Sequence, residues 1–252
     1  MIVFPIPLLF ATFLVLSLTA WLGVTRFQKL RAEAAALRQE FGVIQGATLT
    51  LLGLIIGFTF SMALDRYEQR KNFEGAEANA INAAFQRAEL LPPADTARLR
   101  SLLVTYLDQR VLFYSSRSLQ QLQQIVRSTP GLQAELWSAV RAPATANPTS
   151  LTALAVESIN NVINAEGDTQ AAWLNRIPGT AWLLMGAIAV FATLLVGIGV
   201  KRDVGFSSVL TVLPLIISIA FYLIADIESP RLGIISVVPE NLMSLAGVVH
   251  GP

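Results

Sequence analysis

Few side chains in this sequence are suited to chemistry, and they lie far apart. The chain holds no cysteine and a single histidine, His250. The absence of thiols excludes disulfides, thiolate metal sites and cysteine nucleophiles. Among the acidic residues that lie close in sequence are Glu74 with Glu77, one helical turn apart, and Glu166 with Asp168. Neither pair has the ligand count of a calcium loop or a histidine partner for a transition metal. We therefore expect no metal site, no cofactor and no catalytic centre.

The composition favours a membrane protein and excludes a nucleic-acid-binding one. Of the 252 residues 54% are hydrophobic and only 14% are charged, against about 25% charged residues in soluble proteins. The 18 Lys and Arg nearly balance the 17 Asp and Glu, so no net field is available to hold a polyanion. Membrane lipid is the expected partner.

Four apolar stretches are long enough to cross a hydrocarbon core about 30 Å thick, which needs about 20 helical residues. They cover residues 2–24, 43–64, 181–200 and 206–225. The stretches form two hairpins, 1–64 and 181–225, separated by a polar insert at 65–180. Apolar residues of the insert recur at three- and four-residue steps, which is typical of helices. We predict an all-α integral membrane protein with four transmembrane helices, arranged as two hairpins that flank a helical extramembrane insert.

Two further predictions concern the ends of the spans. Residues 41–91 contain no proline. The second span is therefore predicted to run past the membrane as a stalk helix of about 50 residues, roughly 75 Å long at 1.5 Å per residue. The tail, 226–252, is interrupted by Pro239 and cannot span the membrane. We expect it to dock on the insert through Leu242, Met243 and Leu245.

Basic residues in the hairpin loops predict the orientation. They are Arg26, Lys29, Arg31 and Arg38 in loop 25–42, and Lys201 and Arg202 in loop 201–205. Short cytoplasmic loops are enriched in Lys and Arg, so both loops are predicted to be cytoplasmic and the insert periplasmic. Arg66, Arg70 and Lys71 directly follow the second span and favour the opposite orientation.

The second span carries small residues on one helical face: Gly46, Gly53, Gly57 and Ser61. Small residues let helices approach closely in lipid, where packing drives association, so we predict a helix-packing face. Packing against another span of the same subunit is favoured over a contact between subunits.

A second stripe of the same span is apolar and bulky, with Leu52, Ile56, Phe60 and Leu64 at four-residue steps. It faces lipid, the usual neighbour of an apolar face, or forms a hydrophobic constriction that gates a pore by dewetting. The span has too few polar side chains for a wide wet pore, namely Gln45, Thr48, Thr50, Thr59 and Ser61.

Charged residues mark the membrane edge where the second and fourth spans end. The insert joins the second span to the third, so these two ends emerge on the same face of the membrane. Ions at the hydrocarbon edge are costly unless they are paired or hydrated. We predict a collar of ion pairs and keep an ion-selectivity ring as the alternative. The collar residues are Asp65, Arg66, Arg70, Asp226, Glu228 and Arg231.

Several segments resemble bacterial bestrophin-like membrane proteins, a family of unsettled function distantly related to the bestrophin anion channels. These segments are Gly53 to Met62, Asp65-Arg66-Tyr67, Glu77 to Ile81, Leu90-Leu91-Pro92, Tyr106-Leu107-Asp108 with Arg110, and Asp226 to Arg231 with Gly233. Bestrophins proper are pentameric, calcium-activated anion channels with four spans per subunit, and bulky apolar residues of their second span line the pore. The resemblance implies a homo-oligomeric anion channel in the bacterial inner membrane, with Ile56, Phe60 and Leu64 at the pore.

Alternatives remain open at this point. A non-conducting scaffold or envelope sensor, whose insert binds a partner, fits the residues nearly as well. Bestrophins keep their middle domain in the cytosol, which is opposite to the orientation that the loop charges predict. Their calcium clasp is an acidic cluster with no counterpart in this sequence. An enzyme is the class that the residues favour least, because no nucleophile-base pair or metal-ligand spacing is present.

Overall fold

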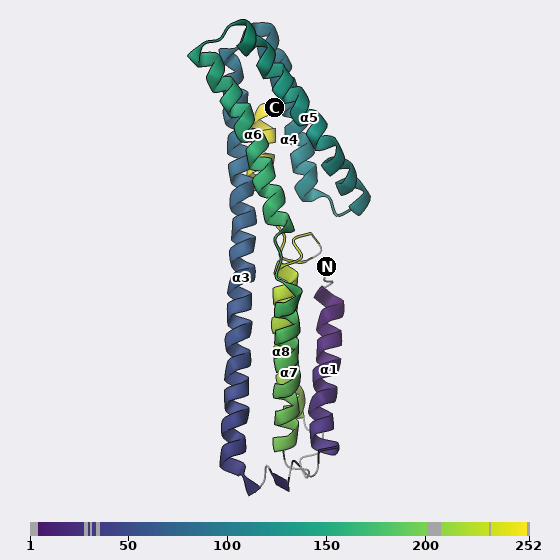
Figure 1. Ribbon diagram of the computed structural model, residues 1–252. Coiled ribbons are helices and arrows are strands. Elements are labelled where there is room, and N and C mark those ends of the chain that lie inside the picture. The colour runs from purple at the N-terminus through teal and green to yellow at the C-terminus, as the bar shows by residue number, and fades with distance from the viewer. Residues whose placement is uncertain are drawn as a thin grey trace. The chain divides into compact units, whose positions relative to one another are not determined.

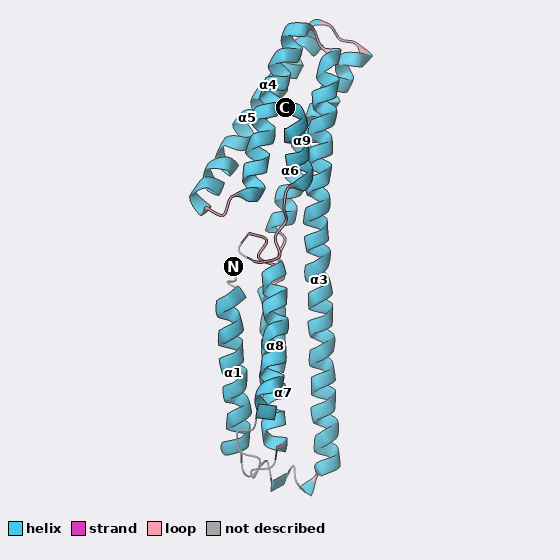
Figure 2. Cartoon of the chain, turned by 180° about the vertical axis from the view of Figure 1, so that it is seen from behind, coloured by secondary structure: helices cyan, strands magenta, loops and turns pink. Residues whose placement is uncertain are grey.

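The computed structural model describes residues 5–27, 30, 32–33, 36–200, 208–231 and 233–250. Within these ranges all regular elements are helices, which confirms the predicted all-α class (Figure 2). In chain order they are α1 (Pro5–Thr25), α3 (Arg38–Arg87), η1 (Ala88–Leu90), α4 (Pro93–Ser115), α5 (Leu119–Ala146), α6 (Ser150–Leu174), α7 (Gly179–Gly199), α8 (Ser208–Ile227) and α9 (Glu240–Val249). Four of the loop cations used to predict orientation lie outside the described residues: Lys29, Arg31, Lys201 and Arg202.

The predicted spans and stalk are present. Four helical stretches in the described part of the chain are long and apolar enough to cross a membrane, and they contain α1, α3, α7 and α8. Helix α3 is one uninterrupted helix of 50 residues, as the lack of proline in 41–91 predicts. It ends before Pro92-Pro93, where Leu91 adopts extended backbone angles, because a residue that precedes proline disfavours the α conformation.

The chain folds as two compact units, unit 1 (Met1–Asp65 with Arg176–Ser236) and unit 2 (Arg66–Asn175 with Val237–Pro252). In unit 1, helix α1 packs against both α7 and α8 (Figure 1). The backbones of α1 and α7 approach most closely at Gly23 and Gly197. A Cβ added to Gly23 would lie 2.6 Å from the carbonyl oxygen of Leu194, and one added to Gly197 would collide with the carbonyl oxygen of Ala20.

In unit 2, α4 packs against α5 and α9, and α5 packs against α6. Large apolar side chains from α3 to α6 fill its core, including Ile81, Leu99, Leu103, Leu136 and Ile159. The C-terminal helix α9, seen beside α4 in Figure 2, adds Leu242 and Leu245 to this core. Met243 is 53% exposed, which differs from its expected role as an anchor because it lies on the outer side of this amphipathic helix.

Candidate functional site

One face of α3 has no neighbour among the described residues. A Cβ added to Gly46, Gly53 or Gly57 would meet no described atom within 4 Å, and Ser61 is exposed. The opposite face is buried in unit 1 through Leu52, Thr59 and Ala63. The described chain covers the other side of the helix, and the packing partner of the small face remains a prediction.

The apolar stripe lies next to this small face. Phe60 and Leu64 are 38% and 40% exposed, Ile56 is half-buried, and Leu52, the first residue of the stripe, is buried in unit 1. At the same four-residue step the row continues in unit 2 with Glu68 and Asn72, both exposed and polar. Each four-residue step turns about 40° around a helix with 3.6 residues per turn, so Glu68 lies near the face of Leu64, whereas Asn72 has turned about 160° from Ile56.

A second bulky aromatic side chain of α3 lies on another face. Phe58 is 65% exposed and is two residues away from Phe60, which is about 200° around a helix with 3.6 residues per turn. The row that contains Phe58 at four-residue steps leads through Met62 to Arg66 and then to Arg70, which is fully buried in unit 2. Beyond the span, the four-residue row that contains Phe60 therefore reaches exposed polar side chains, whereas the row that contains Phe58 reaches a buried arginine.

Two predicted collar residues of unit 1, Asp226 and Glu228, accept hydrogen bonds from backbone N–H groups. The carboxylate of Asp226 is buried and accepts the N–H groups of Ile234 and Ile235, both at 2.8 Å. Glu228 accepts the N–H of Ile177 at 2.9 Å just before α7, and Arg176 donates to the carbonyl oxygen of Glu228 at 3.0 Å. Both carboxylates thus satisfy loop amides next to α8, which would otherwise be buried unpaired.

The remaining collar residues differ in exposure. Arg70 is buried in unit 2 and donates to the carbonyl oxygens of Ala172 and Asn175, 3.2 and 3.1 Å away. These carbonyls end α6, so a cation there also complements the helix dipole. Asp65 is exposed, whereas Arg66 and Arg231 are half-buried. The collar as a set of ion pairs remains a prediction.

Unit 2 contains a buried charged cluster that the sequence did not predict. Glu77 of α3 accepts hydrogen bonds from Arg110 and Tyr114 of α4 and from Thr169 of α6. A second carboxylate, Glu166 of α6, lies 3.5 Å from the guanidinium of Arg110. Glu77 and Arg110 are at most 1% exposed, and Glu166 is 6% exposed. The cluster joins three helices through one cation.

The environment fixes the charge states of the α4 groups. Burial by itself lowers the pKa of the Arg110 guanidinium, but the attraction of the Glu77 carboxylate raises that pKa overall, so Arg110 stays charged. Burial raises the pKa of the Tyr114 phenol far above its usual value, and the nearby Glu77 raises it further. Tyr114 is therefore neutral and serves as a hydrogen-bond donor. The Arg110 guanidinium also lies 4.3 Å from the centre of the Phe113 ring.

Comparison with known proteins assigns the family. The family model of the bestrophin-like domain matches residues 10–242. The chain belongs to the bestrophin-like family. Two crystal structures of variants of a bacterial bestrophin homologue from Klebsiella pneumoniae are similar to this bestrophin-like chain. One is 14% identical with a TM-score of 0.64 and covers 95% of this chain and 99% of that one. The other is 13% identical with a TM-score of 0.66 and covers 95% and 97%.

The similarity to these structures lies in the fold. A third crystal structure, described as a membrane protein, is 14% identical, has a TM-score of 0.65 and covers 94% of this chain and 98% of that one. No curated protein matches the chain. Because the identities are this low, the likeness to solved structures establishes the membrane-protein fold of the bestrophin-like chain, and its activity has to be argued from its own residues.

Several residues in the segments that resemble the family make contacts within the fold. Glu77, Tyr106 and Arg110 belong to the buried cluster of unit 2 or its surroundings. Asp226 closes the loop that follows α8, and Gly233 fits there because an added Cβ would lie 2.9 Å from the Cγ of Asp226. These motif residues therefore hold the bestrophin-like fold together. Within the part of the chain that the structure describes, no cluster of three or more metal-ligating side chains occurs.

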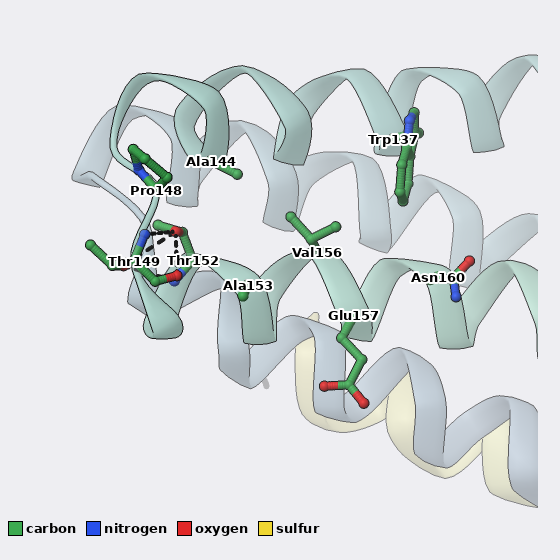
Figure 3. A pocket seen from close by; sticks show the side chains of 9 residues that line it. All are labelled: Trp137, Ala144, Pro148, Thr149, Thr152, Ala153, Val156, Glu157 and Asn160. Atoms are coloured by element: carbon green, nitrogen blue, oxygen red, sulfur yellow. Dashed lines mark hydrogen bonds between the residues drawn. The ribbon is translucent and has the colours of Figure 1, made fainter.

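Unit 2 also has an open groove between α5 and α6, with a volume of about 570 Å³. Figure 3 shows Trp137 of α5 projecting toward α6 and Val156 of α6 projecting toward α5. The groove lies beside the start of α6, where the side chain of Thr149 accepts the N–H of Thr152 at 3.2 Å. Glu157 and Asn160 of α6 are also among its lining residues. The lining is mostly apolar.

Proposed function

We propose that this bestrophin-like protein is a homo-oligomeric ion channel in which α3 lines the pore and anions are the conducted ions. Its membership of the bestrophin-like family supports the channel class, and the anion preference follows the resemblance to bestrophins. The proposal needs no catalytic residue, cofactor or metal.

The observation that carries the proposal is the uncovered face of α3. Gly46, Gly53 and Gly57 present a flat backbone surface that no described residue of the subunit meets. In lipid, such a surface favours close association with another helix. Further copies of the chain would supply that helix, and a ring of copies would place one α3 face toward the central axis.

The row of Ile56, Phe60 and Leu64 then provides the gate. A narrow ring of apolar side chains stops ions by excluding water, and it opens when the ring widens. Leu64 is followed at the four-residue step by exposed Glu68 and Asn72, which suit a wet vestibule beyond the gate. Asp226 and Glu228 are engaged with loop amides and contribute structure to this arrangement.

The location that accompanies this proposal is the bacterial inner membrane, with the insert on the periplasmic side. The excess of Lys and Arg in loop 25–42 supports this orientation. A cysteine introduced at exposed Arg117 should react with a membrane-impermeant thiol reagent in intact cells. A cysteine at exposed Gln39 should react only after the inner membrane is opened. The reverse labelling pattern would place the insert in the cytosol.

Mass and flux test the channel function together. The purified protein in detergent should give the mass of a defined ring-sized oligomer by light scattering or native mass spectrometry. Reconstituted into liposomes, it should conduct chloride, and Phe60→Ala should raise the flux several-fold because the gate becomes wider and wets more easily. Phe58→Ala is the matched control and should leave the flux unchanged. A clean monomer in detergent would contradict the proposal.

The α5–α6 groove favours a second candidate, a non-conducting scaffold or envelope sensor. An apolar groove of about 570 Å³ with Trp137 at its side is suited to binding a partner through unit 2. A stable oligomer that conducts no ions in liposomes, with Phe60→Ala equally silent, would favour this candidate over the channel.

A further inference from the structure

The buried cluster of unit 2 places two carboxylates against one cation. Both oxygens of Glu77 are occupied. Oε1 accepts from Nε of Arg110, and Oε2 accepts from Nη2 of Arg110 at 3.3 Å and from the hydroxyls of Tyr114 and Thr169, each at 3.2 Å. Glu77 is 0% exposed, so its carboxylate has no access to bulk solvent. Among the described residues, Arg110 is the cation paired with it.

The second carboxylate, Glu166, has poorer partners. Its Oε2 accepts from Gln133 of α5 at 3.2 Å. Its Oε1 is buried, makes no hydrogen bond, and lies 3.5 Å from Nη1 of Arg110. This distance is longer than a charge-assisted hydrogen bond, which spans about 2.7–2.9 Å. The guanidinium that already serves Glu77 is therefore the cation nearest to Glu166.

Among the residues that the structure describes, the other groups bonded to the two carboxylates are uncharged. Burial raises the pKa values of the Tyr106 and Tyr114 phenols on α4, so both are neutral. Helix α5 contributes the amide of Gln133, and α6 contributes the hydroxyl of Thr169. Glu74, one turn before Glu77, is bound instead to the amide of Asn241 and the backbone N–H of Leu242 at the start of α9.

With both carboxylates ionised, the cluster would hold one uncompensated negative charge at a buried site, where Glu77 is 0% and Glu166 is 6% exposed. Removing an unpaired charge from water costs several kcal/mol, and a buried acid avoids this cost by binding a proton. We propose that Glu77 and Glu166 together bind one proton at neutral pH, so that the cluster of α3, α4 and α6 is electrically neutral.

This proton site links pH to the packing of unit 2. When the proton leaves, a second negative charge appears beside Glu77, and Glu166 is the carboxylate with the fewer bonds to lose on moving toward water. Helix α6 is therefore the element that loosens. The inference stands apart from the proposed channel function, because it uses contacts within unit 2 only.

Infrared spectroscopy of the full-length protein in detergent tests the proposal, because a protonated carboxyl has a carbonyl band separate from that of a carboxylate. At neutral pH the wild-type protein should show this band, with a downshift in heavy water, and raising the pH should remove it. Both Glu77→Gln and Glu166→Gln should lose the band, because either substitution leaves one carboxylate for one arginine. Glu157→Gln, at an exposed position of α6, is the matched control and should keep it.

The infrared spectrum of the wild-type protein tests the proposal even if a variant does not fold. Absence of a protonated carboxyl band from the wild-type protein at neutral pH would overturn the proposal. So would a band that persists in both folded variants, because the proton would then lie on another carboxyl such as Asp226.

Discussion

In unit 1 two helices touch backbone to backbone at Gly23 and Gly197, whereas in unit 2 large side chains such as Leu103 and Leu136 separate the helices. The polar contacts differ as well. In unit 1 the hydroxyls of Thr19 and Thr193 meet at 2.8 Å across α1 and α7. In unit 2 a buried arginine faces two carboxylates.

This difference is explained by the surroundings of each unit, which are lipid for the spans of unit 1 and water for the insert in unit 2. Lipid chains are as apolar as leucine, so helices in a membrane gain little by burying apolar surface and associate through close packing. In water, burial of apolar surface drives association, and larger side chains bury more of it. Helices α1, α7 and α8 and the first part of α3, up to Asp65, belong to unit 1, and the broad core belongs to unit 2. The predictions below test this contrast.

The largest effect is expected from Arg110→Ala. It leaves two carboxylates buried with no cation, and breaking a buried ion pair from one side costs about 3–5 kcal/mol. Unit 2 should unfold at a much lower temperature in detergent, as followed by circular dichroism. Arg98→Ala changes an exposed arginine of the same helix and should shift the unfolding temperature only slightly. Equal effects of the two substitutions would show that the cluster contributes little to stability.

Gly197→Ala should destabilise unit 1, because the added methyl group lies at the contact between α1 and α7. The new Cβ would collide with the backbone of Ala20, so α1 and α7 must separate, at a cost of about 1–3 kcal/mol. Thermal unfolding or protease sensitivity in detergent measures this cost. Gly186→Ala on the same helix meets no described atom within 4 Å and should be neutral or slightly stabilising. If both variants behave alike, the close contact is not what holds α1 to α7.

Asp226→Asn should have a smaller effect, about 1–2 kcal/mol. The amide that replaces the carboxylate places an N–H donor where Asp226 accepts from Ile234 and Ile235, so one backbone N–H loses its partner. Hydrogen exchange of these two backbone amides is the local measurement, and faster exchange in the variant is the expected result. Unchanged protection would mean that the loop does not depend on this carboxylate.

Gly57→Ala should have the smallest effect on the folded subunit, because the face around Gly57 is open. A helical glycine replaced by alanine gains up to about 1 kcal/mol from helix propensity. Gly57→Leu should leave the fold intact as well, yet reduce the oligomer mass in detergent if this face meets another copy. An unchanged oligomer mass in the Gly57→Leu protein would show that the small face contacts lipid and not another copy of the chain.

The fold was predictable because its main features are local in sequence. Length and apolar composition give the spans, and the proline-free segment gives the 50-residue α3. Local sequence rules fail for helix α5. It continues through Pro130 and Pro143, although proline inside a helix costs about 3 kcal/mol. Packing of residues such as Leu136 and Val140, both fully buried, offsets that cost.

The long-range contacts were not predictable from one sequence. The GxxxG spacing led to Gly53 and Gly57 as the packing site within the subunit, yet the close helix contact lies at Gly23 and Gly197. A spacing of Thr-x-x-x-Gly in both α1 and α7 is the feature that indicates this contact. Glu77 was paired in sequence with Glu74, while its partners Arg110 and Thr169 come from distant helices.

Cysteine modification is the most direct test of the claim that α3 lines an ion pore. The chain holds no cysteine, so Phe60→Cys and Phe58→Cys each introduce a single thiol, and the parent protein controls for side reactions. A charged, water-soluble thiol reagent should block chloride flux through Phe60→Cys in liposomes and leave Phe58→Cys unaffected. Block of Phe58→Cys with Phe60→Cys untouched, or flux that neither modification changes, would contradict the account.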